Sequence, residues 1–470
     1  MFRQTNYLCP MNHLTDTIIA PATPQGQSAI AVIRLSGTDA IAITDRIFKG
    51  KKLNDVDSHT IHYGWIVDGN KEIDEVMVSV FKAPKTFTTE DSTEISCHGS
   101  PQLVQAIISL AIKNGAKSAY PGEFTLRAFL NGRLDLSQAE AVADLIHATS
   151  TKSSEIALQQ LKGHFSTMLK DLRQELIDFA ALIELELDFS EEDVEFAHRG
   201  RLKDLIHKII QVINPLLDSF RWGNSVKEGI PVAIIGAPNA GKSTLLNTIL
   251  NEEKALVSDI AGTTRDFIED TLVIDGIVFR FIDTAGIRET SDILEGLGIE
   301  RSKQKLREAE IVLFLSDINN SINDTITDFH NLELTKDQTG VILLNKADTI
   351  SAAQAEPKTQ TIAESSGVKT MLITAKYKET LQPLLTYFSE YIKSHNQAEG
   401  TIISNTRHYE ALENTKLCLQ KVLEGIDSGI SSDFIAMDIR ESLFHLGTIT
   451  GQVSTDDLLE SIFSKFCIGK

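Results

Sequence analysis

Residues 236–243 form a glycine-rich loop of the kind that binds phosphate. They read Gly-Ala-Pro-Asn-Ala-Gly-Lys-Ser, a GxxxxGKS pattern between the apolar run 232–235 and a helix-like stretch at 244–250. In a strand–loop–helix arrangement, glycines let backbone N–H groups close around phosphate oxygens at the helix N-terminus. The Lys242 ammonium then reaches the β- and γ-phosphates, and the Ser243 hydroxyl ligates Mg²⁺. A chance glycine-rich turn is the alternative, and the flanking patterns argue against it.

Two later motifs indicate that the nucleotide is GTP. Residues 283–286, Asp-Thr-Ala-Gly, follow an apolar run and supply a carboxylate for the Mg²⁺ shell and a glycine N–H for the γ-phosphate. Residues 345–348, Asn-Lys-Ala-Asp, follow another apolar run. The Asp348 carboxylate only accepts hydrogen bonds, so it matches the N1–H and N2–H₂ donors of guanine, which adenine lacks. This motif alone is weak because Asn and Asp favour turns, but in order after the other two it is strong.

Two further segments complete a nucleotide site. Residues 374–376 follow the apolar run 371–373 and fit the last base-contacting loop. Residues 262–266 lie between the phosphate loop and residues 283–286, where a switch loop is expected. A threonine there would complete the Mg²⁺ shell and sense the γ-phosphate.

The residue after the Asp-Thr-Ala-Gly motif bears on hydrolysis. Many GTPases place there a glutamine that orients water, whereas this chain has Ile287, which has no hydrogen-bonding group. The charged loop that follows offers substitutes, although a solvated loop is the ordinary meaning of such residues: Arg288, Glu289, Asp292, Glu295 and Glu300. Asn239, inside the phosphate loop, is a second candidate, because its amide oxygen would hold a K⁺ ion beside the phosphates. Alternatively, Asn239 only shapes the loop.

The composition is that of an ordinary globular protein with an acidic balance. The 470 residues suffice for two to four domains, with 42% hydrophobic and 23% charged residues. The 65 acidic against 45 basic residues give a net charge of −20, which argues against a nucleic-acid footprint over the whole chain and leaves room for a local basic patch.

The cysteines and apolar runs indicate a cytoplasmic setting without membrane insertion. None of the four cysteines forms a CxxC pair, so a zinc or redox motif lacks support and a reducing compartment is the simplest setting. No apolar run approaches the roughly 18–20 residues that span a bilayer, and the N-terminus lacks a secretory signal. Residues 1–10 are expected to be a disordered extension, or translation starts at Met11.

The elements that must position these motifs fall into four segments. Short β-rich runs and a helix pattern predict an α+β domain over 1–130. Apolar residues spaced by threes and fours predict helices over 131–227 and again over 393–470: Leu161, Phe165, Met168, Leu172, Leu176, Phe179, Ile183 and Leu187, then Tyr409, Leu412, Leu419, Val422, Leu423, Phe434, Leu443, Leu446 and Ile449. Strands alternate with helices over 228–392, as a doubly wound parallel sheet requires. The predicted fold class is therefore a multidomain α/β protein in which a P-loop GTPase domain interrupts a helical bundle domain.

Several stretches outside the GTPase motifs resemble one family, the tRNA-modification GTPases called MnmE or TrmE. The resemblance covers residues 16 to 470. Its marks are DTIIA at 16–20 with AVIRLSG at 31–37, PGEFTLRAFLNG at 121–132 running into LDLSQAEA at 134–141, and FCIGK at 466–470.

The resemblance implies a function and partners. It implies an N-terminal domain that binds a 5-formyl-tetrahydrofolate-type carrier and forms a homodimer. It implies a K⁺-stimulated GTPase that uses Mg²⁺ and hydrolyses GTP when the two G domains of the dimer meet. Together with the FAD protein MnmG, such a GTPase installs aminomethyl or carboxymethylaminomethyl groups on the wobble uridine of tRNA.

The resemblance also implies roles for particular residues. Asn239, Ser258, Ile260 and Thr263 match the K⁺ site, and Ser243 and Thr264 match the Mg²⁺ ligands. Glu295 matches the catalytic glutamate that orients water, with Lys242 as the second catalytic residue. Arg34, Glu94, Arg133 and Lys470 match folate contacts, and Cys467 is a candidate reactive thiol. The expected GTP contacts are Asn239, Ala240, Gly241, Lys242, Ser243, Thr244, Ser258, Asp259, Ile260, Ala261, Gly262, Thr263, Thr264, Asp283, Thr284, Ala285, Gly286, Asn345, Lys346, Asp348, Thr374, Ala375 and Lys376.

The sequence departs from the family pattern at a few points. Ser28 stands where a second glycine is usual, Thr374 replaces the commoner serine, and residues 377–379 lack a glycine. A GTPase that assembles ribosomes or scaffolds RNA, without modification chemistry, is the alternative from another class. No GxxG segment of a KH domain supports it, and the folate-type N-terminus opposes it.

Overall fold

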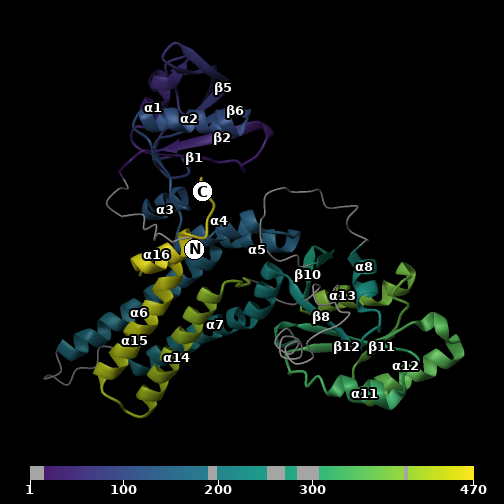
Figure 1. Ribbon diagram of the computed structural model, residues 1–470. Helices are drawn as coiled ribbons and strands as arrows, with labels where there is room; N and C mark the ends of the chain where they lie inside the picture. Colours follow the sequence, from purple (N-terminus) through teal and green to yellow (C-terminus); the bar gives the residue numbers. More distant parts are fainter. Residues whose placement is uncertain (1–14, 189–197, 251–269, 283–305, 396–400) are drawn as a thin grey trace, which may run out of the picture. The chain divides into compact units, whose positions relative to one another are not determined.

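The structure, a computed structural model, describes residues 15–188, 198–250, 270–282, 306–395 and 401–470 (Figure 1). Backbone contacts divide the chain into two compact units. Unit 1 comprises Met1–Ile146, Gln159–Ile209 and Asn414–Lys470, and unit 2 comprises His147–Leu158 and Ile210–Glu413. The expectation for residues 1–10 lies outside the described ranges.

Unit 1 begins with a seven-stranded sheet in the order β3-β4-β5-β6-β2-β1-β7. The elements are β1 (Ile18–Pro21), β2 (Ser28–Ser36), α1 (Ala40–Ile47), β3 (Phe48–Lys49), η2 (Leu53–Asp55), β4 (Thr60–Asp68), β5 (Lys71–Phe81), β6 (Ser92–Gly99), α2 (Pro101–Lys113) and β7 (Lys117–Ser118). Strand side chains alternate between the two faces. Ile33 of β2, Val78 of β5 and Ile95 of β6 therefore pack in one core with Ile43 of α1 and Ile107 of α2. Helices α1 and α2 cover one face, and the other face carries the polar residues of the site below.

A buried arginine joins the start of the sheet to the helix α3 (Glu123–Leu130). The Arg127 side chain is 1% exposed. Its Nη2 donates to Glu123 Oε1 at 2.8 Å, and its Nη1 donates to the Glu90 carboxylate at 3.2 Å and to the backbone oxygen of Asp16 at 2.7 Å. The Glu90 carboxylate also accepts from the Ser36 hydroxyl at 2.8 Å. One guanidinium thus holds together the chain before β1, the loop between β5 and β6, and α3.

Helices from distant parts of the sequence pack together in unit 1. Three of them lie wholly in unit 1: α6 (His164–Asp188), α15 (Ser432–Thr450) and α16 (Asp456–Phe463). Four others cross a unit boundary in the sequence, the first by its last residue only: α4 (Leu136–His147), α5 (Thr151–Leu161), α7 (Arg199–Glu228) and α14 (Thr406–Asp427). Figure 1 shows α6 and α15 side by side, and Arg173 Nε donates to the Leu443 oxygen at 3.2 Å. Phe165, Leu172 and Ile183 of the predicted stripe are buried.

The helix stripes differ from the prediction at two places. Leu161 ends α5 rather than beginning α6, since the chain breaks at Gly163, whose φ is +81°. Phe434 is 61% exposed, and its neighbour Ile435 takes the buried position on α15.

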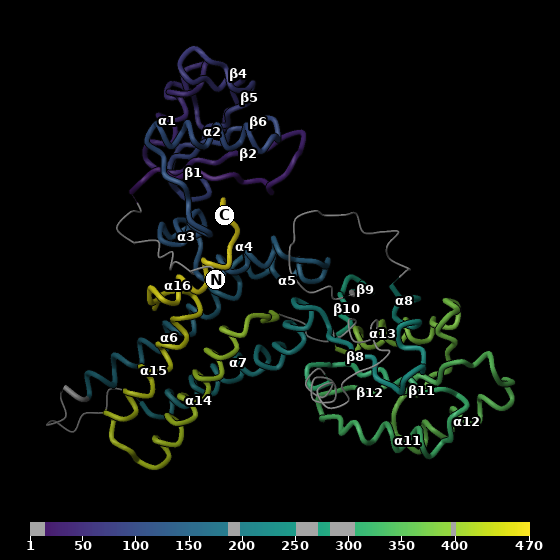
Figure 2. The backbone as a smooth tube through the Cα atoms, in the orientation of Figure 1, coloured from purple at the N-terminus to yellow at the C-terminus, as the bar shows by residue number. Residues whose placement is uncertain are grey.

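Unit 2 contains a six-stranded sheet in the order β13-β12-β11-β8-β10-β9. The elements are β8 (Ile230–Gly236), α8 (Lys242–Leu250), β9 (Asp270–Ile274), β10 (Ile277–Ile282), β11 (Ile311–Asp317), α11 (Ile322–His330), β12 (Thr339–Asn345), η4 (Ala347–Thr349), α12 (Ala352–Ser366), β13 (Lys369–Leu372), η5 (Lys378–Leu381) and α13 (Gln382–His395). Helices cover both faces, with α11 and α12 on one side and α8 and α13 on the other (Figure 2). On β11, Leu313 packs in the core that contains Phe388 of α13, whereas its neighbour Phe314 packs with Phe329 of α11.

The predicted fold class is confirmed, with one difference in the sheet. Strands β13, β12, β11, β8 and β10 are parallel, but β9 pairs with β10 in the antiparallel direction. The cause is the two-residue turn of Asp275 and Gly276, with φ values of +48° and +76°, because such turns join antiparallel hairpin strands. Among the described residues, no helix is both long enough and apolar enough to cross a membrane.

Replacing Arg127 by methionine should lower the free energy of unfolding of the N-terminal sheet by about 3–5 kcal/mol. The reason is that the buried Glu123 carboxylate would lose its counter-ion. Urea unfolding followed by the fluorescence of Trp65 in β4, in a Trp222→Phe background, measures the change, since these are the two tryptophans of the chain.

Arg440→Met is the matched control for this substitution. Arg440 pairs with Glu184 at 3.1 Å, and both side chains are more than half exposed, so the loss should be about 1 kcal/mol or less. Equal losses from the two substitutions would contradict a structural role for the buried arginine.

Candidate functional site

The phosphate-type loop connects the end of β8 to the start of α8. Lys242 is the first residue of α8, and its Nζ donates to the carbonyl oxygens of Gly236 at 2.8 Å and Ala237 at 3.0 Å. Burial lowers the pKa of the Lys242 ammonium. Asn239 adopts a left-handed backbone with φ of +62° and is exposed. The loop therefore curves around the lysine, with its N–H groups at a helix N-terminus that attracts anions.

Asn345 connects this loop to the two base-type loops. It is 3% exposed at the carboxyl end of β12. Its Nδ2 donates to the Ala240 oxygen at 2.7 Å, and its Oδ1 accepts from the Ala375 N–H at 2.8 Å. Gly241 has φ of +102°, and a Cβ there would lie 2.3 Å from Asn345 Nδ2, so glycine permits this close approach. One buried amide thus holds three predicted nucleotide loops together.

The base-type loops present charged side chains beyond this buried amide. Asp348 Oδ2 lies 3.1 Å from Lys376 Nζ, and this hydrogen bond raises the pKa of the lysine. The Asp348 side chain is 31% exposed, so its carboxylate is accessible to the donors of a base. The ammonium of Lys346 pairs with Asp317 Oδ2 at 2.7 Å.

Two residues of this region were not predicted. Burial acts to raise the pKa of Asp317, but hydrogen bonds from Lys346 and Asn319 outweigh it and lower that pKa. Thr380 Oγ1 accepts from the Thr374 N–H at 3.0 Å and lies 2.9 Å from the Thr374 oxygen, which closes the loop that lacks the usual glycine. The position of Asp317 at the end of a predicted strand could have indicated that it belongs to this region, because the carboxyl ends of parallel strands meet at one edge of the sheet.

The predicted nucleotide residues divide into described and undescribed sets. The described ones, all in loops at the carboxyl edge of the sheet or in the first turn of α8, are Asn239, Ala240, Gly241, Lys242, Ser243, Thr244, Asn345, Lys346, Asp348, Thr374, Ala375 and Lys376. Those outside the described residues are Ser258, Asp259, Ile260, Ala261, Gly262, Thr263, Thr264, Asp283, Thr284, Ala285, Gly286 and Glu295. Ser243, the second residue of α8, offers the hard hydroxyl oxygen that suits Mg²⁺.

A second candidate site lies on the face of the N-terminal sheet opposite α1 and α2, where Phe124 of α3 packs against β1. A cavity of about 630 Å³ is lined by residues of β2, β6, the loop before β6 and residues 131–133. Arg34 donates to Glu94 Oε1 through Nε at 2.9 Å and Nη2 at 2.8 Å. The centroid of the Phe87 ring lies close to two guanidinium groups, 5.7 Å from that of Arg34 and 5.1 Å from that of Arg133. Sequence reasoning missed Phe87, since its place beside both arginines depends on the loop conformation.

The C-terminus reaches the same site. The pKa of Lys470 is lowered, mainly by burial and to a smaller extent by the positive charge of Arg34, and the charge of Glu94 opposes this shift. Gly469 has φ of +95°, and a Cβ there would lie 2.1 Å from the Pro21 oxygen. Arg34, Glu94 and Arg133 therefore line one cavity. Lys470, more than 400 positions from Arg34 in the chain, lies close enough for the charges of Arg34 and Glu94 to shift its pKa. The Cys467 thiol is free and exposed.

The loops around Asn345 lie at the carboxyl edge of a doubly wound sheet. They define the class of protein as a P-loop nucleotide-binding protein with a base-binding loop of the guanine type. A protein-family model described as the MnmE helical domain matches residues 136–467. A second family model, described as the GTP-binding protein TrmE N-terminus, matches residues 17–133. The chain belongs to the MnmE family of tRNA modification GTPases.

Curated relatives resemble the chain over its whole length. A tRNA modification GTPase MnmE of Cytophaga hutchinsonii is 52% identical over 461 residues, which are 98% of this chain and 98% of the relative. One of Flavobacterium johnsoniae is 50% identical over 466 residues, which are 97% and 99% of the two chains. The protein is thus a GTP-hydrolysing enzyme of tRNA modification, and its family implies GTP and Mg²⁺. Among solved structures, the FeoB G-domain from Methanococcus jannaschii aligns with 35% of this chain and 98% of that chain at 20% identity and a TM-score of 0.25, too low to support an argument.

Asn345→Ala should weaken GTP binding by about tenfold to a hundredfold. The buried Ala375 N–H and Ala240 carbonyl would lose their partner, at a cost of about 1–3 kcal/mol for such groups. Titration with a fluorescent guanine nucleotide measures the affinity. Asn331→Ala, at an exposed position after α11, is the control and should leave the affinity unchanged. Unchanged binding in both variants would show that the bridge does not organise the site.

Proposed function

We propose that this protein binds GTP and Mg²⁺ at the loops joined by Asn345 and couples hydrolysis to modification of the wobble uridine of tRNA. The observation that carries the proposal is the single buried amide that ties the phosphate-type loop to the residue 374–376 loop. Lys242 would contact the β- and γ-phosphates, and Ser243 with Thr264 would ligate Mg²⁺. Asp348 would accept the N1–H and N2–H₂ donors of guanine.

Hydrolysis would depend on K⁺ and on a glutamate in place of the usual glutamine. Asn239, Ser258, Ile260 and Thr263 would hold K⁺ beside the phosphates, where it stabilises negative charge in the transition state. The exposed left-handed position of Asn239 supports this, because the amide is free to turn toward a nucleotide. Glu295 would orient the attacking water, since Ile287 has no group that does so.

The N-terminal cavity would bind a folate such as 5-formyl-tetrahydrofolate. Arg34, Arg133 and Lys470 supply positive charge for the carboxylates of its glutamate tail, and Glu94 supplies an acceptor for pterin donors. Phe87 offers a ring face for stacking. Cys467 is exposed and lies three residues before Lys470 in the sequence, and it would be the reactive thiol.

The protein would act as a homodimer with MnmG and tRNA in the cytoplasm. The face of the N-terminal sheet opposite α1 and α2 supports self-association, because it exposes Ile30, Ile61, Tyr63 and Met77 at 50–65% each. Tyr63 and Met77 are direct cross-strand neighbours, and Ile61 follows on the same face. Such a patch typically marks an interface. MnmG would supply basic surface for tRNA, since this chain has a net charge of −20.

Deletion of the gene in the source organism, followed by nucleoside analysis of its tRNA, tests the proposal against the alternative of a scaffold GTPase. We expect loss of the C5 substituent of the wobble uridine, which returns with the wild-type gene but not with Lys242→Ala, because that variant lacks the phosphate-contacting ammonium. An unchanged wobble uridine in the deletion strain would favour the scaffold function.

K⁺ should accelerate GTP hydrolysis about 10–100-fold more than Na⁺ at equal ionic strength. Asn239→Gly should remove this difference and retain GTP binding, because glycine keeps the φ of +62° while it removes the side chain that carries the amide oxygen. Steady-state phosphate release in the two salts measures the effect. Equal rates in K⁺ and Na⁺ for the wild-type protein would refute the K⁺ mechanism.

A further inference from the structure

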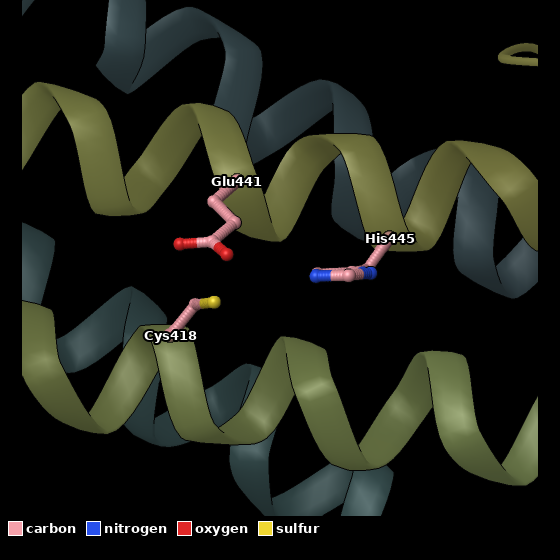
Figure 3. Close-up of side chains that lie close together, drawn as sticks. All are labelled: Cys418, Glu441 and His445. Carbon is pink, nitrogen blue, oxygen red and sulfur yellow. The ribbon is translucent and has the colours of Figure 1, made fainter.

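A cluster of three metal-ligating side chains lies in the helical part of unit 1. Cys418 of α14 faces Glu441 and His445 of α15 (Figure 3). The sulfur, a carboxylate oxygen and an imidazole nitrogen all lie within 4.8 Å of one another. None of these residues belongs to the nucleotide loops or to the N-terminal cavity.

The helices place the three ligands so that they converge. Glu441 and His445 are four residues apart, which puts them one turn apart on the same face of α15. Cys418 comes from the neighbouring helix α14 and is 4% exposed, whereas His445 is half-buried and Glu441 is exposed. A cavity of about 270 Å³ is lined by all three. The arrangement combines a deep sulfur ligand with two ligands that an ion reaches from solvent.

The charges around the cluster favour a cation. Glu424 and Glu441 line the cavity with a single ammonium, that of Lys421. Asp438, one turn before Glu441 on α15, adds a third carboxyl group. Burial raises the pKa of this group. Burial and then the charge of Glu441 raise the pKa of Cys418 to about 11. A cysteine thiol is ordinarily protonated near neutral pH, so an ion that binds there must release this proton.

We propose that Cys418, Glu441 and His445 form a Zn²⁺ site that joins α14 to α15. Sulfur, nitrogen and oxygen donors together suit Zn²⁺, a borderline-soft ion that takes all three. Tetrahedral bonds of about 2.0–2.3 Å put ligand atoms roughly 3.3–3.7 Å apart. Because the three ligand atoms lie within 4.8 Å of one another, side-chain rotations that move them by about 1 Å complete the site. The Cys418 S–H bond breaks, a sulfur–zinc bond forms, and the proton leaves to solvent. A water molecule takes the fourth position.

Metal titration of the untagged full-length protein, after treatment with a chelator, tests this proposal. Co²⁺ serves as the spectroscopic probe, and we expect one equivalent to produce a sulfur-to-metal charge-transfer band that Zn²⁺ then abolishes by displacement. Zn²⁺ should also raise the melting temperature, since it binds the folded state.

Ligand variants and matched controls decide the outcome. Cys418→Ser, Glu441→Gln and His445→Asn should each weaken Zn²⁺ binding by about 100-fold or more, because even residues outside the ligand shell typically contribute 10–100-fold. Glu441 is exposed and His445 half-buried, so their variants should fold normally. Cys467→Ser and His164→Asn, which change an exposed thiol and an exposed imidazole, should bind as the wild type does. Absence of the charge-transfer band, or its loss in Cys467→Ser instead of Cys418→Ser, would overturn the assignment.

Discussion

The buried amide of Asn345 is the interaction on which the candidate nucleotide site depends. Parallel strands β8 and β12 end at the same edge of the sheet, so each delivers its loop to one place. Proximity alone would leave these loops free to move independently. By donating to Ala240 and accepting from the Ala375 N–H, Asn345 makes the conformation of the phosphate-type loop depend on that of the 374–376 loop. In a buried setting both bonds are costly to break.

The N-terminal cavity depends in the same way on a charge buried away from the ligand face. Arg127 contacts no cavity residue that we assign to folate, yet it binds the loop that carries Glu90 and, a few residues earlier, Phe87. The C-terminal Lys470 then approaches Arg34 because Gly469 passes closely over Pro21. Both candidate sites therefore follow one physical rule: a buried, hydrogen-bonded polar group positions the exposed groups that we propose bind the ligand.

The proposed zinc site changes the meaning of the cysteine count. Without a CxxC pair, the sequence predicts no zinc motif, since that pattern describes ligands close together in one loop. Cys418 and His445 are 27 positions apart on two packed helices, and only the packing brings them together. An ion there would join α14 to α15, the helix that precedes α16 and the terminal Lys470.

The amino-acid sequence by itself determined the order of motifs, the doubly wound sheet, the helix stripes and the family, because each of these depends on local patterns: strand and helix periodicity, and short loops of defined composition. The sequence also predicted Asn345 and Arg34 as site residues, but not which neighbouring groups their side chains contact. The tertiary structure alone decided that Asn345 bridges two loops and that Asp317 pairs with Lys346. It also decided that Phe87 lies close to two arginines and that Cys418 faces Glu441 and His445. The physical reason is that these contacts join residues far apart in the chain, and no local periodicity encodes which helix face or loop conformation brings them within bonding distance.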